Sequence, residues 1–501
     1  MDLHRLLKQH WGYAEFRAKQ ESIVRSILDG RDVAVIMPTG GGKSLCYQLP
    51  AIAMERTCVV VSPLIALMQD QAAQLQQAGV AAAFLNSALD LASQREIQRR
   101  AQRGAFRLLY LSPERLVRDE VLDWLRRVPL GFFAIDEAHC ISEWGHEFRP
   151  EYRQLRALRD WFPETPIAAF TASATRAVRH DIVAQLRLRD PAKFVMSFHR
   201  PNLRYVVHEC GPREQDPLLF AALGYYGEGN VIVYAPTVKG VEETAALLSN
   251  RRLPVVAYHG QMKTAERQRN QETWMSGEKR ILVGTLAFGL GINKPDVRAV
   301  IHLALPKSLE QYYQEAGRAG RDGVQADCVL LWQKRDIGLL AHFIQQLQEP
   351  GERERSWQRY HAMRHFAESP ECRHRRICLH FGETPKWDRC DACDQCGVEL
   401  EWISERASRG EPARAERKKA AKPQIIDRNI NPAIRDALRE WRRSMAKEMG
   451  MPPYVVMHDS TLDAICRRAP RTIAELCEVP GIGEKRAESF GEEILRVIAR
   501  A

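Results

Sequence analysis

Short apolar runs alternate with helix-like stretches from about residue 30 to residue 200. Continuous apolar strands separated by helices are typical of a parallel sheet that is covered on both faces. The pattern therefore predicts an α/β domain. The apolar runs cover residues 32–37, 57–62, 106–112, 131–135 and 166–171, and the helical stretches between them include 64–78 and 151–161.

The same alternation returns after a break near residues 199–204, where Pro201 and Asn202 interrupt any regular element. We therefore expect two tandem parallel-sheet domains, at residues 1–202 and 203–345. The strands expected in the second domain are 231–234, 255–258, 280–284 and 299–303, and the helices are 241–250, 265–275 and 308–316.

The alternation ends near residue 345. A helical, cysteine-bearing module is expected at residues 346–400. Residues 401–428 indicate a basic linker, since 401–425 contain seven Lys and Arg, four Glu and few large apolar side chains. A compact helical domain is predicted at residues 429–501, with helices at 432–448, 461–468, 472–476 and 484–500.

The chain has 501 residues, 45% of them hydrophobic, which predicts several folded units and little disorder. Its formal net charge of +10 favours a polyanionic partner, although many basic proteins bind no nucleic acid. The N-terminal residues lack the apolar core of a secretory signal, and no apolar run reaches the ~18–20 residues of a membrane span. We expect a soluble, cytoplasmic protein with no membrane partner.

A glycine-rich loop at residues 37–44 follows an apolar strand and precedes a helix. Glycine lets backbone N–H groups close around a triphosphate, and the start of the helix adds its positive end. Lys43 is expected to reach the β- and γ-phosphates, and the Ser44 hydroxyl is expected to bind Mg²⁺. A glycine-rich surface turn is the alternative, and Met37 stands where the usual pattern begins with glycine. The predicted nucleotide contacts of the loop are Thr39, Gly40, Gly41, Gly42, Lys43 and Ser44.

Asp136 and Glu137 close another predicted strand, as the first residues of an Asp-Glu-Ala-His box. A carboxylate at the end of a strand can hold Mg²⁺, and its neighbour can polarise the attacking water. We assign Asp136 to the metal and Glu137 to the general base. As an isolated string the box could equally begin a solvated helix, but together with the phosphate loop in one sheet it indicates an ATP site.

Tyr13, Arg17 and Gln20 precede the first predicted strand. An aromatic ring and an amide suit stacking on adenine and bidentate contact with its N6/N7 edge. The alternative is the start of an amphipathic helix. We predict that these residues bind the base of ATP.

Arg318 and Arg321 lie in the second α/β domain, within a glycine-containing segment at residues 314–323. If the segment is helical, residues three apart are neighbours. Arginines delivered across a cleft can stabilise charge on a transferring phosphoryl group, an effect worth roughly 10³–10⁵ in rate. On its own, the pair could be an ordinary surface feature.

Together these motifs resemble the second superfamily of helicases, and in particular the RecQ DNA helicases, over nearly the whole chain. The resemblance implies two RecA-like motor domains. It also implies that Thr171 and Ser173 belong to a motif that links hydrolysis to domain movement. The similar segments include residues 16–20, 37–50, 61–71, 170–175 and 287–296.

Residues 140–152 follow the acidic box and resemble the aromatic-rich loop of the RecQ family. Aromatic side chains on a loop can stack on single-stranded bases, at roughly 1–3 kcal/mol each. The alternative is that Trp144 and Phe148 are core residues, but the adjoining Gly, His, Arg and Pro argue against continuous burial. The residues expected to bind DNA and couple it to hydrolysis are Trp144, His146, Phe148 and Arg149.

Cys390, Cys393 and Cys396 are each three residues apart, and five of the twelve cysteines lie between residues 372 and 396. Three thiolates on a tight turn need a fourth ligand from elsewhere. The RecQ resemblance places it upstream, at Cys372 and not at Cys378, which we expect to be a packed thiol. Four thiolates suit a closed structural Zn²⁺ site, with an iron–sulfur cluster as the competing interpretation.

The C-terminal residues 479–487 form a predicted glycine turn that begins a helix, and they resemble the HRDC domain that ends many RecQ chains. Lys485 or Arg486 could hold a DNA phosphate there, or could be solvated charges on a packing turn. The family usually has a winged-helix domain before HRDC. Only 34 residues, Gly397 to Ile430, lie in that interval, so we expect the winged helix to be missing.

The resemblance implies an ATP-dependent DNA helicase that moves 3′ to 5′ on single-stranded DNA and unwinds duplexes in DNA repair and recombination. Its expected cofactors are ATP, Mg²⁺ and Zn²⁺. Its expected partners are single-stranded and branched DNA and a single-strand DNA-binding protein, and the chain is expected to be a monomer. The alternative is a DNA-stimulated ATPase or translocase that remodels or anneals strands and unwinds weakly. A DNA-binding scaffold with a dead motor is disfavoured, because the motor residues are all present.

Overall fold

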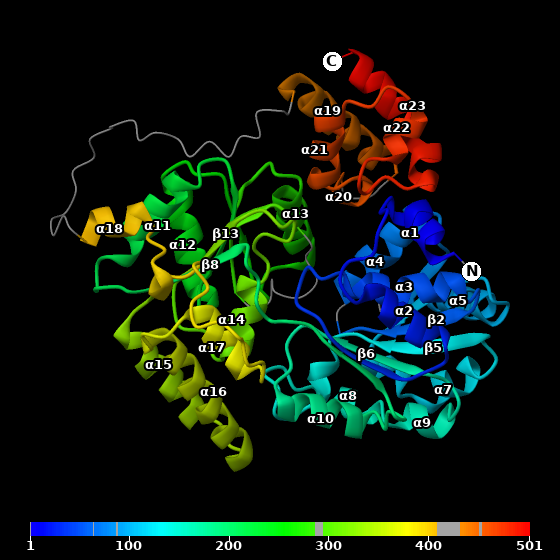
Figure 1. Ribbon diagram of the computed structural model, residues 1–501, viewed down its shortest axis with the longest axis horizontal. Helices are drawn as coiled ribbons and strands as arrows, with labels where there is room; N and C mark the ends of the chain where they lie inside the picture. The colour runs from blue at the N-terminus through cyan, green and yellow to red at the C-terminus, as the bar shows by residue number, and fades with distance from the viewer. Residues whose placement is uncertain are drawn as a thin grey trace. The chain divides into compact units, whose positions relative to one another are not determined.

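The computed structural model describes residues 2–63, 65–86, 89–285, 294–407, 431–449 and 453–500. The chain divides into two compact units, of which one comprises residues 1–196 together with 429–501 and the other comprises residues 197–428. The division falls directly after Met196, a few residues before the predicted boundary at residue 202. Each unit contains one parallel sheet (Figure 1).

The sheet of the first unit has seven strands in the order β3-β4-β2-β5-β6-β1-β7, and every neighbouring pair is parallel. Strands β5 and β1 both pair with β6, so the chain segments that follow these three strands emerge side by side. The strands are β1 (Val33–Ile36), β2 (Thr57–Val61), β3 (Ala82–Leu85), β4 (Leu108–Leu111), β5 (Leu130–Ile135), β6 (Ile167–Thr171) and β7 (Ala192–Val195).

Helices connect these strands and cover the sheet (Figure 1). The helix expected over residues 151–161 is two short helices, with a break after Gln154. The helices are α1 (Leu3–Trp11), α2 (Gln20–Leu28), α3 (Lys43–Ala53), α4 (Ile65–Gln77), α5 (Leu91–Gln102), α6 (Pro113–Leu116), α7 (Asp119–Leu125), α8 (Pro150–Gln154), α9 (Ala157–Trp161) and α10 (Arg176–Gln185), with the 3₁₀ helix η1 (Ala138–Ile141) after β5.

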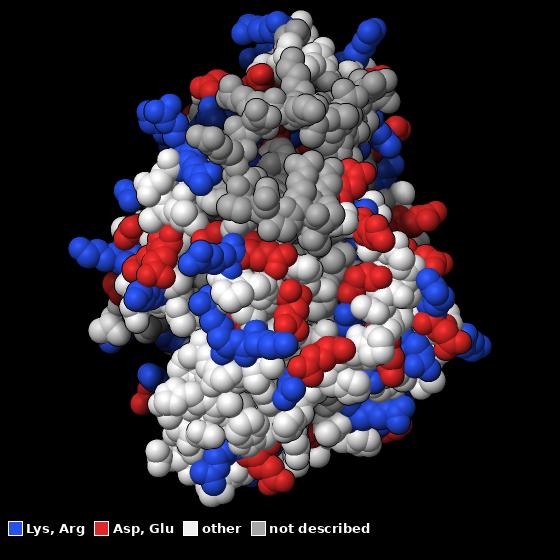
Figure 2. All heavy atoms as spheres, turned by 90° about the vertical axis from the view of Figure 1, so that its left-hand side faces the viewer, with Lys and Arg blue, Asp and Glu red and all other residues white. Residues whose placement is uncertain are grey.

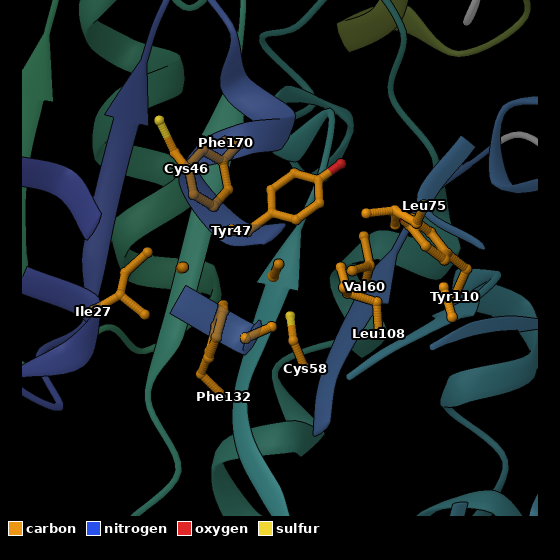
Figure 3. Packing of buried hydrophobic residues seen from close by; sticks show 14 of the residues in the cluster. Ile27, Cys46, Tyr47, Cys58, Val60, Leu75, Leu108, Tyr110, Phe132 and Phe170 are labelled. Atoms are coloured by element: carbon orange, nitrogen blue, oxygen red, sulfur yellow. The ribbon is translucent and has the colours of Figure 1, made fainter. Parts of the chain in front are cut away.

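The core of this domain lies between the central strands and α3. Tyr47 from α3 meets Phe170 from β6 edge to face, with ring centroids 5.3 Å apart, and both side chains are fully buried (Figure 3). Aromatic pairs of this geometry add roughly 0.5–1.5 kcal/mol beyond their area burial. The helix that begins at the phosphate loop is thus fixed to the strand that ends at Thr171.

The sheet of the second unit has six parallel strands in the order β10-β11-β9-β12-β13-β8. The strands are β8 (Leu203–Glu209), β9 (Asn230–Tyr234), β10 (Val255–Tyr258), β11 (Ile281–Gly284), β12 (Val297–His302) and β13 (Ala326–Trp332). The helices between them are α11 (Gln215–Tyr225), α12 (Val238–Asn250), α13 (Thr264–Met275) and α14 (Leu309–Ala316).

Helices replace strands after residue 333, earlier than the predicted end of the alternation near residue 345. They are α15 (Lys334–Gln345), α16 (Pro350–Glu368), α17 (Arg373–His380), the 3₁₀ helix η3 (Asp394–Cys396) and α18 (Glu401–Ala407). Helix α18 corrects the linker prediction at its start, because Leu400 and Trp402 are buried in the hydrophobic core of the second unit. The rest of the predicted linker, residues 408–428, lies outside the described residues.

The C-terminal domain has its own core, in which buried Leu438, Leu462, Leu476 and Ile494 pack together. All four helices predicted there are present, within two residues at each end, and one short helix was not predicted. The five are α19 (Pro432–Glu448), α20 (Pro453–Val456), α21 (Asp459–Arg468), α22 (Ile473–Cys477) and α23 (Glu484–Arg500). Among the described residues, no helix is both long and apolar enough to cross a membrane.

Candidate nucleotide site, arginine turn and metal centre

The predicted phosphate loop connects β1 to the start of α3. Gly40 and Gly42 both have φ of +83°, in the left-handed region that glycine adopts without strain. A Cβ atom at Gly42 would also lie 2.3 Å from Nε2 of Gln20. Two of the loop's glycines are therefore required by backbone geometry, as expected for a loop whose N–H groups must converge.

Gln20 supports this loop from the start of α2. Its Nε2 donates to the carbonyl of Gly41 at 3.0 Å, and its Oε1 accepts the backbone N–H of Arg17 at 2.8 Å. Tyr13 is 37% exposed, and the Arg17 guanidinium lies 5.8 Å from the centre of its ring. The three residues predicted to contact adenine thus lie beside the loop, and the Gln20 amide is hydrogen-bonded to it.

The acidic box follows β5. Asp136 is buried, and Tyr152 donates its hydroxyl proton to the Asp136 carbonyl at 2.9 Å. Glu137 has φ of +47°, a conformation that is costly for a non-glycine residue and that turns the chain sharply after the strand. Because β5 and β1 flank β6, the box and the phosphate loop emerge at the same edge of the sheet.

Burial and then the adjacent charge of Glu137 raise the pKa of Asp136 to about 7. Burial alone would also raise the pKa of Glu137, but the hydrogen bond from His139 and the positive charges of His139 and Lys43 lower it to about 2. Lys43 acts on both carboxyl groups. The loop lysine and the acidic box therefore form one electrostatic site, in which Glu137 is held as the anion.

His139 joins this box to two other motifs. Its Nδ1 lies 3.3 Å from a carboxylate oxygen of Glu137 and 2.9 Å from the Thr171 hydroxyl, and its Nε2 lies 3.7 Å from Glu147. Burial alone would lower the pKa of His139, but Cys140, Glu137 and Glu147 raise it well above its usual value. We did not single out this histidine from the sequence, although it is the last residue of the predicted box.

Gln71 on α4 holds the predicted Mg²⁺ ligand. Its Nε2 donates to the Ser44 hydroxyl at 3.3 Å, and its Oε1 accepts the hydroxyl protons of Tyr47 at 2.8 Å and Tyr110 at 3.0 Å. This network fixes the orientation of the Gln71 amide. The sequence offered a signal for it, because Gln71 ends a segment that resembles a family motif.

The aromatic-rich loop presents Trp144 to solvent, with 54% of its surface exposed, so the alternative of a core tryptophan is wrong. Phe148 is half-buried beneath the Arg153 guanidinium, 5.4 Å from its ring centre. The His146 ring stacks on that of His139 at 4.9 Å, and Arg149 donates to the carbonyl of Pro63 at 3.4 Å. The loop is therefore tied to the residues around the acidic box.

Thr171 is the last residue of β6, Ser173 lies just after the strand, and both are buried. The Ser173 backbone N–H donates to the Thr171 hydroxyl at 3.3 Å. The same hydroxyl faces His139, so the predicted coupling motif contacts the acidic box through that ring.

In the second unit, α14 ends at Ala316, and Arg318 and Arg321 lie in the turn that follows it, which we call the arginine turn (residues 317–323). The helical spacing considered for the pair therefore does not apply. Burial raises the pKa of Tyr234 to about 12, although the positive charges of Arg318 and Arg321 lower it. Tyr234 is the last residue of β9. The segment at residues 287–293 that resembles a second-lobe motif lies outside the described residues.

Charge of one sign does not dominate the face drawn in Figure 2. Over the described residues visible there, Lys and Arg side chains are interspersed with Asp and Glu. The described residues therefore form no patch of one sign on this face.

The metal prediction concerned Cys372, Cys390, Cys393 and Cys396, and their Sγ atoms all lie within 4.8 Å of one another. The Sγ atoms of Cys393 and Cys372 are 3.9 Å apart. A tetrahedral Zn²⁺ site with Zn–S bonds of 2.3 Å places its sulfurs about 3.8 Å apart, so the four thiols fit the ion. Hydrogen bonds from Cys390 and then Cys393 lower the pKa of Cys372 to about 4.

Cys378 does not belong to this group. It is buried on α17, and burial raises the pKa of its thiol above the usual range. The geometry thus agrees with the choice of Cys372 over Cys378 as the fourth sulfur.

The C-terminal glycine turn packs within the first compact unit. A Cβ atom at Gly483 would lie 2.5 Å from the carbonyl oxygen of Gln9, and Arg486 donates to the Oε1 of Gln77 at 3.2 Å. Lys485 lies 3.0 Å from Glu488, and its stem approaches Gly79. The two basic residues considered for a DNA phosphate therefore have protein partners here.

Four family models match the chain. They are described as DEAD/DEAH box helicase (residues 17–181), helicase conserved C-terminal domain (218–323), RecQ zinc-binding (334–397) and HRDC domain (431–498). Among solved structures, Mss116p bound to single-stranded RNA and AMP-PNP has a TM-score of 0.55 at 18% identity, over 67% of this chain and 73% of that one. The MrfA helicase bound to DNA and AMPPNP has a TM-score of 0.53 at 17% identity, over 65% of this chain and 49% of that one.

Curated relatives are more similar in sequence. The ATP-dependent DNA helicase RecQ of Bacillus subtilis is 32% identical over 99% of this chain and 98% of its own length. The RecQ helicase of Haemophilus influenzae is 42% identical over 78% of this chain and 63% of its own length. The RecQ helicase of Pasteurella multocida is 42% identical over 77% of this chain and 61% of its own length. The chain thus spans about three fifths of the latter two proteins.

The two parallel-sheet domains, with a phosphate loop and an acidic box on the first, define a helicase motor. The chain belongs to the RecQ family of ATP-dependent DNA helicases.

Proposed function

We propose that the protein is an ATP-dependent DNA helicase that moves 3′ to 5′ along single-stranded DNA and unwinds duplexes during DNA repair and recombination. The observation that carries the proposal is that the phosphate loop of Lys43 and the acidic box of Asp136 and Glu137 emerge from β1 and β5 at the same edge of one sheet. The RecQ relatives, which are named as ATP-dependent DNA helicases, support the choice of DNA as the polymer.

In the proposed reaction, the N–H groups of the phosphate loop and Lys43 bind the phosphates of ATP. Ser44 and Asp136 would hold Mg²⁺, which would neutralise charge on the phosphates. Glu137 orients the attacking water and accepts its proton, a role that requires the carboxylate as the anion. Arg318 and Arg321 stabilise the charge of the transferring phosphoryl group.

We further propose that DNA controls this reaction through the aromatic-rich loop. The exposed Trp144 is available to stack on a base. His146 stacks on His139, which contacts both Glu137 and Thr171. A DNA base that moves the loop would therefore change the surroundings of Glu137, the proposed general base.

The four-cysteine cluster is proposed to bind Zn²⁺ as a structural ion. The backbone N–H of Arg373 points to Cys393 Sγ at 3.4 Å, and that of Cys390 points to Cys396 Sγ at 3.4 Å. Such N–H groups stabilise thiolates, and a closed site of four thiolates contributes to folding without doing chemistry.

A second candidate function is a DNA-stimulated ATPase or translocase that remodels or anneals strands but unwinds weakly. It is favoured by the interval of residues 398–430 between the zinc-binding and HRDC matches, which is too short for a winged-helix domain.

The proposal is tested by measuring ATP hydrolysis and strand displacement together, on duplexes with a 3′ tail, a 5′ tail or no tail. We expect single-stranded DNA to stimulate hydrolysis and displacement to require the 3′ tail. Lys43→Ala should lower hydrolysis by at least ~10³-fold while single-strand binding survives, since the proposed role of the lysine is to bind phosphate and not DNA. Full hydrolysis in that variant would refute the site, and strong hydrolysis with negligible displacement would select the second candidate.

A further inference from the structure

The segment at residues 197–202 begins the second unit and packs against the arginine turn of the same unit. Within this segment, Nη1 of Arg200 donates to the carbonyl of Gly317 at 2.7 Å. Its Nη2 donates to the carbonyls of Ala319 and Gly320 at 3.0 and 2.9 Å. One half-buried side chain therefore holds three carbonyls of the backbone that carries both proposed catalytic arginines.

Asn202 adds a second set of contacts. Its side-chain Nδ2 donates to the carbonyls of Gly320 at 2.8 Å and Val324 at 3.1 Å. Its backbone carbonyl accepts the backbone N–H of Ala326 at 3.0 Å. Gly320 has φ of +53°, and a Cβ atom there would lie 2.6 Å from Asn202 Nδ2. The glycine is therefore needed both for its backbone conformation and for this close approach.

The chemistry of the contact explains why an arginine is present. The carbonyls of a turn that follows a helix have no intrahelical partners, and they lie beside the negative end of the helix. Helix α14 ends at Ala316, directly before the first of the carbonyls that Arg200 contacts. A guanidinium presents several N–H groups in a rigid plane and keeps its charge at any physiological pH. The donors of a lysine ammonium all radiate from one nitrogen atom.

The other end of the same segment is fixed to the cysteine module. Glu383, which follows α17, accepts the Ser197 hydroxyl at 2.6 Å and the backbone N–H of Phe198 at 2.7 Å. The Phe198 ring stacks on that of Phe381 at 4.4 Å, and the Tyr313 hydroxyl on α14 donates to the Phe198 carbonyl at 3.3 Å. Residues 197–202 are therefore held at both ends within the second unit.

We propose that Arg200, with the support of Asn202, is a positioning residue for ATP hydrolysis, because it sets the backbone from which Arg318 and Arg321 are presented. This inference rests on the proposed function, in which those two arginines stabilise the transferring phosphoryl group. Arg200 itself contacts carbonyls of the arginine turn, so it acts through Arg318 and Arg321.

The test compares Arg200→Ala and Arg200→Lys in the full chain, with kcat and KM for ATP measured on saturating single-stranded DNA. We expect Arg200→Ala to lower kcat by about tenfold or more with KM changed less than about threefold, since the contact matters most in the transition state. Arg200→Lys should retain part of kcat, because lysine keeps the positive charge but lacks the planar set of N–H donors. Equal kcat in Arg200→Ala and the unaltered protein would overturn the proposal.

Arg204→Ala is the matched control. Arg204 is half-buried in the same part of the chain and forms a bidentate ion pair with Asp327 at 2.6 and 2.8 Å, but it does not contact the arginine turn in the described structure. Its removal should lower the melting temperature and leave kcat within about twofold. If kcat in the two alanine variants falls in parallel with their melting temperatures, Arg200 is only structural and the proposal is wrong.

A mutant cycle in the background that lacks both arginines, Arg318→Ala with Arg321→Ala, separates this inference from the function on which it rests. If Arg200 acts through the two arginines, adding Arg200→Ala to that background should slow hydrolysis by no more than about twofold. Additive losses would overturn the positioning role. An unchanged kcat in Arg318→Ala would instead overturn the catalytic role of that arginine, and the positioning inference with it.

Discussion

The two units hold their charged residues in different ways. In the first unit, the acidic box is held through backbone and side chain, since Tyr152 donates to the Asp136 carbonyl and His139 contacts the Glu137 carboxylate and the Thr171 hydroxyl. In the second unit, Arg200 and Asn202 hold the backbone carbonyls of the arginine turn.

The difference follows from the chemistry of the two kinds of group. The charge of a buried carboxylate depends on its neighbours, as the opposite pKa shifts of Asp136 and Glu137 demonstrate. A guanidinium is charged under all physiological conditions, so only its position needs control. The comparison predicts that the first unit is sensitive to side-chain polarity around the box, and that the second unit is sensitive to backbone placement.

The largest expected effect in the first unit is that of Glu137→Gln. The amide has the shape of the carboxylate but cannot accept the proton of the attacking water, so we expect kcat to fall by roughly 10²–10⁴. Binding of an ATP analogue should be retained, because the phosphate loop is unchanged. Fluorescent-nucleotide titration beside a steady-state ATPase assay gives both quantities. A variant with more than a tenth of the normal kcat would contradict the role of general base.

His139→Ala should have a smaller effect. The substitution leaves Glu137 and Glu147 facing each other without the intervening ring, which should raise the pKa of Glu137 and loosen its orientation. We expect kcat to fall by about 10–100-fold, with hydrolysis less responsive to single-stranded DNA. His180→Ala, which removes an exposed histidine from α10, should have normal kinetics. Equal rates in the two variants would show that the side-chain network around the box is dispensable.

Trp144→Ala should have the smallest effect on hydrolysis without DNA, because its side chain is exposed. Stimulation by single-stranded DNA should fall by about tenfold, since one stacking contact is worth roughly 1–3 kcal/mol. A titration of ATPase rate against oligonucleotide concentration measures the change. Leu91→Ala removes another exposed apolar side chain and serves as the control. Unaltered stimulation in Trp144→Ala would leave the loop with a structural role only.

Much of the fold could be predicted because buried parallel strands are continuous apolar runs. Such predicted runs coincide with strands β1, β2, β4, β5 and β6. Strand β7 was not predicted, because as an edge strand its residues are alternately half-buried and exposed, and they include Lys193. The start of the linker was assigned wrongly because its charged composition concealed Trp402, which is buried in the core of the second unit.

The sequence by itself identified the motifs on which the proposed chemistry rests, because phosphate loops, acidic boxes and cysteine spacings need particular residues in a fixed local order. The tertiary structure alone decided which residues support that chemistry. Gln71 reaches Ser44, and Arg200 reaches the turn after α14, from distant positions in the chain. These separations of 27 and 117 positions are bridged by strand order and loop packing, and no local pattern of side chains specifies such contacts.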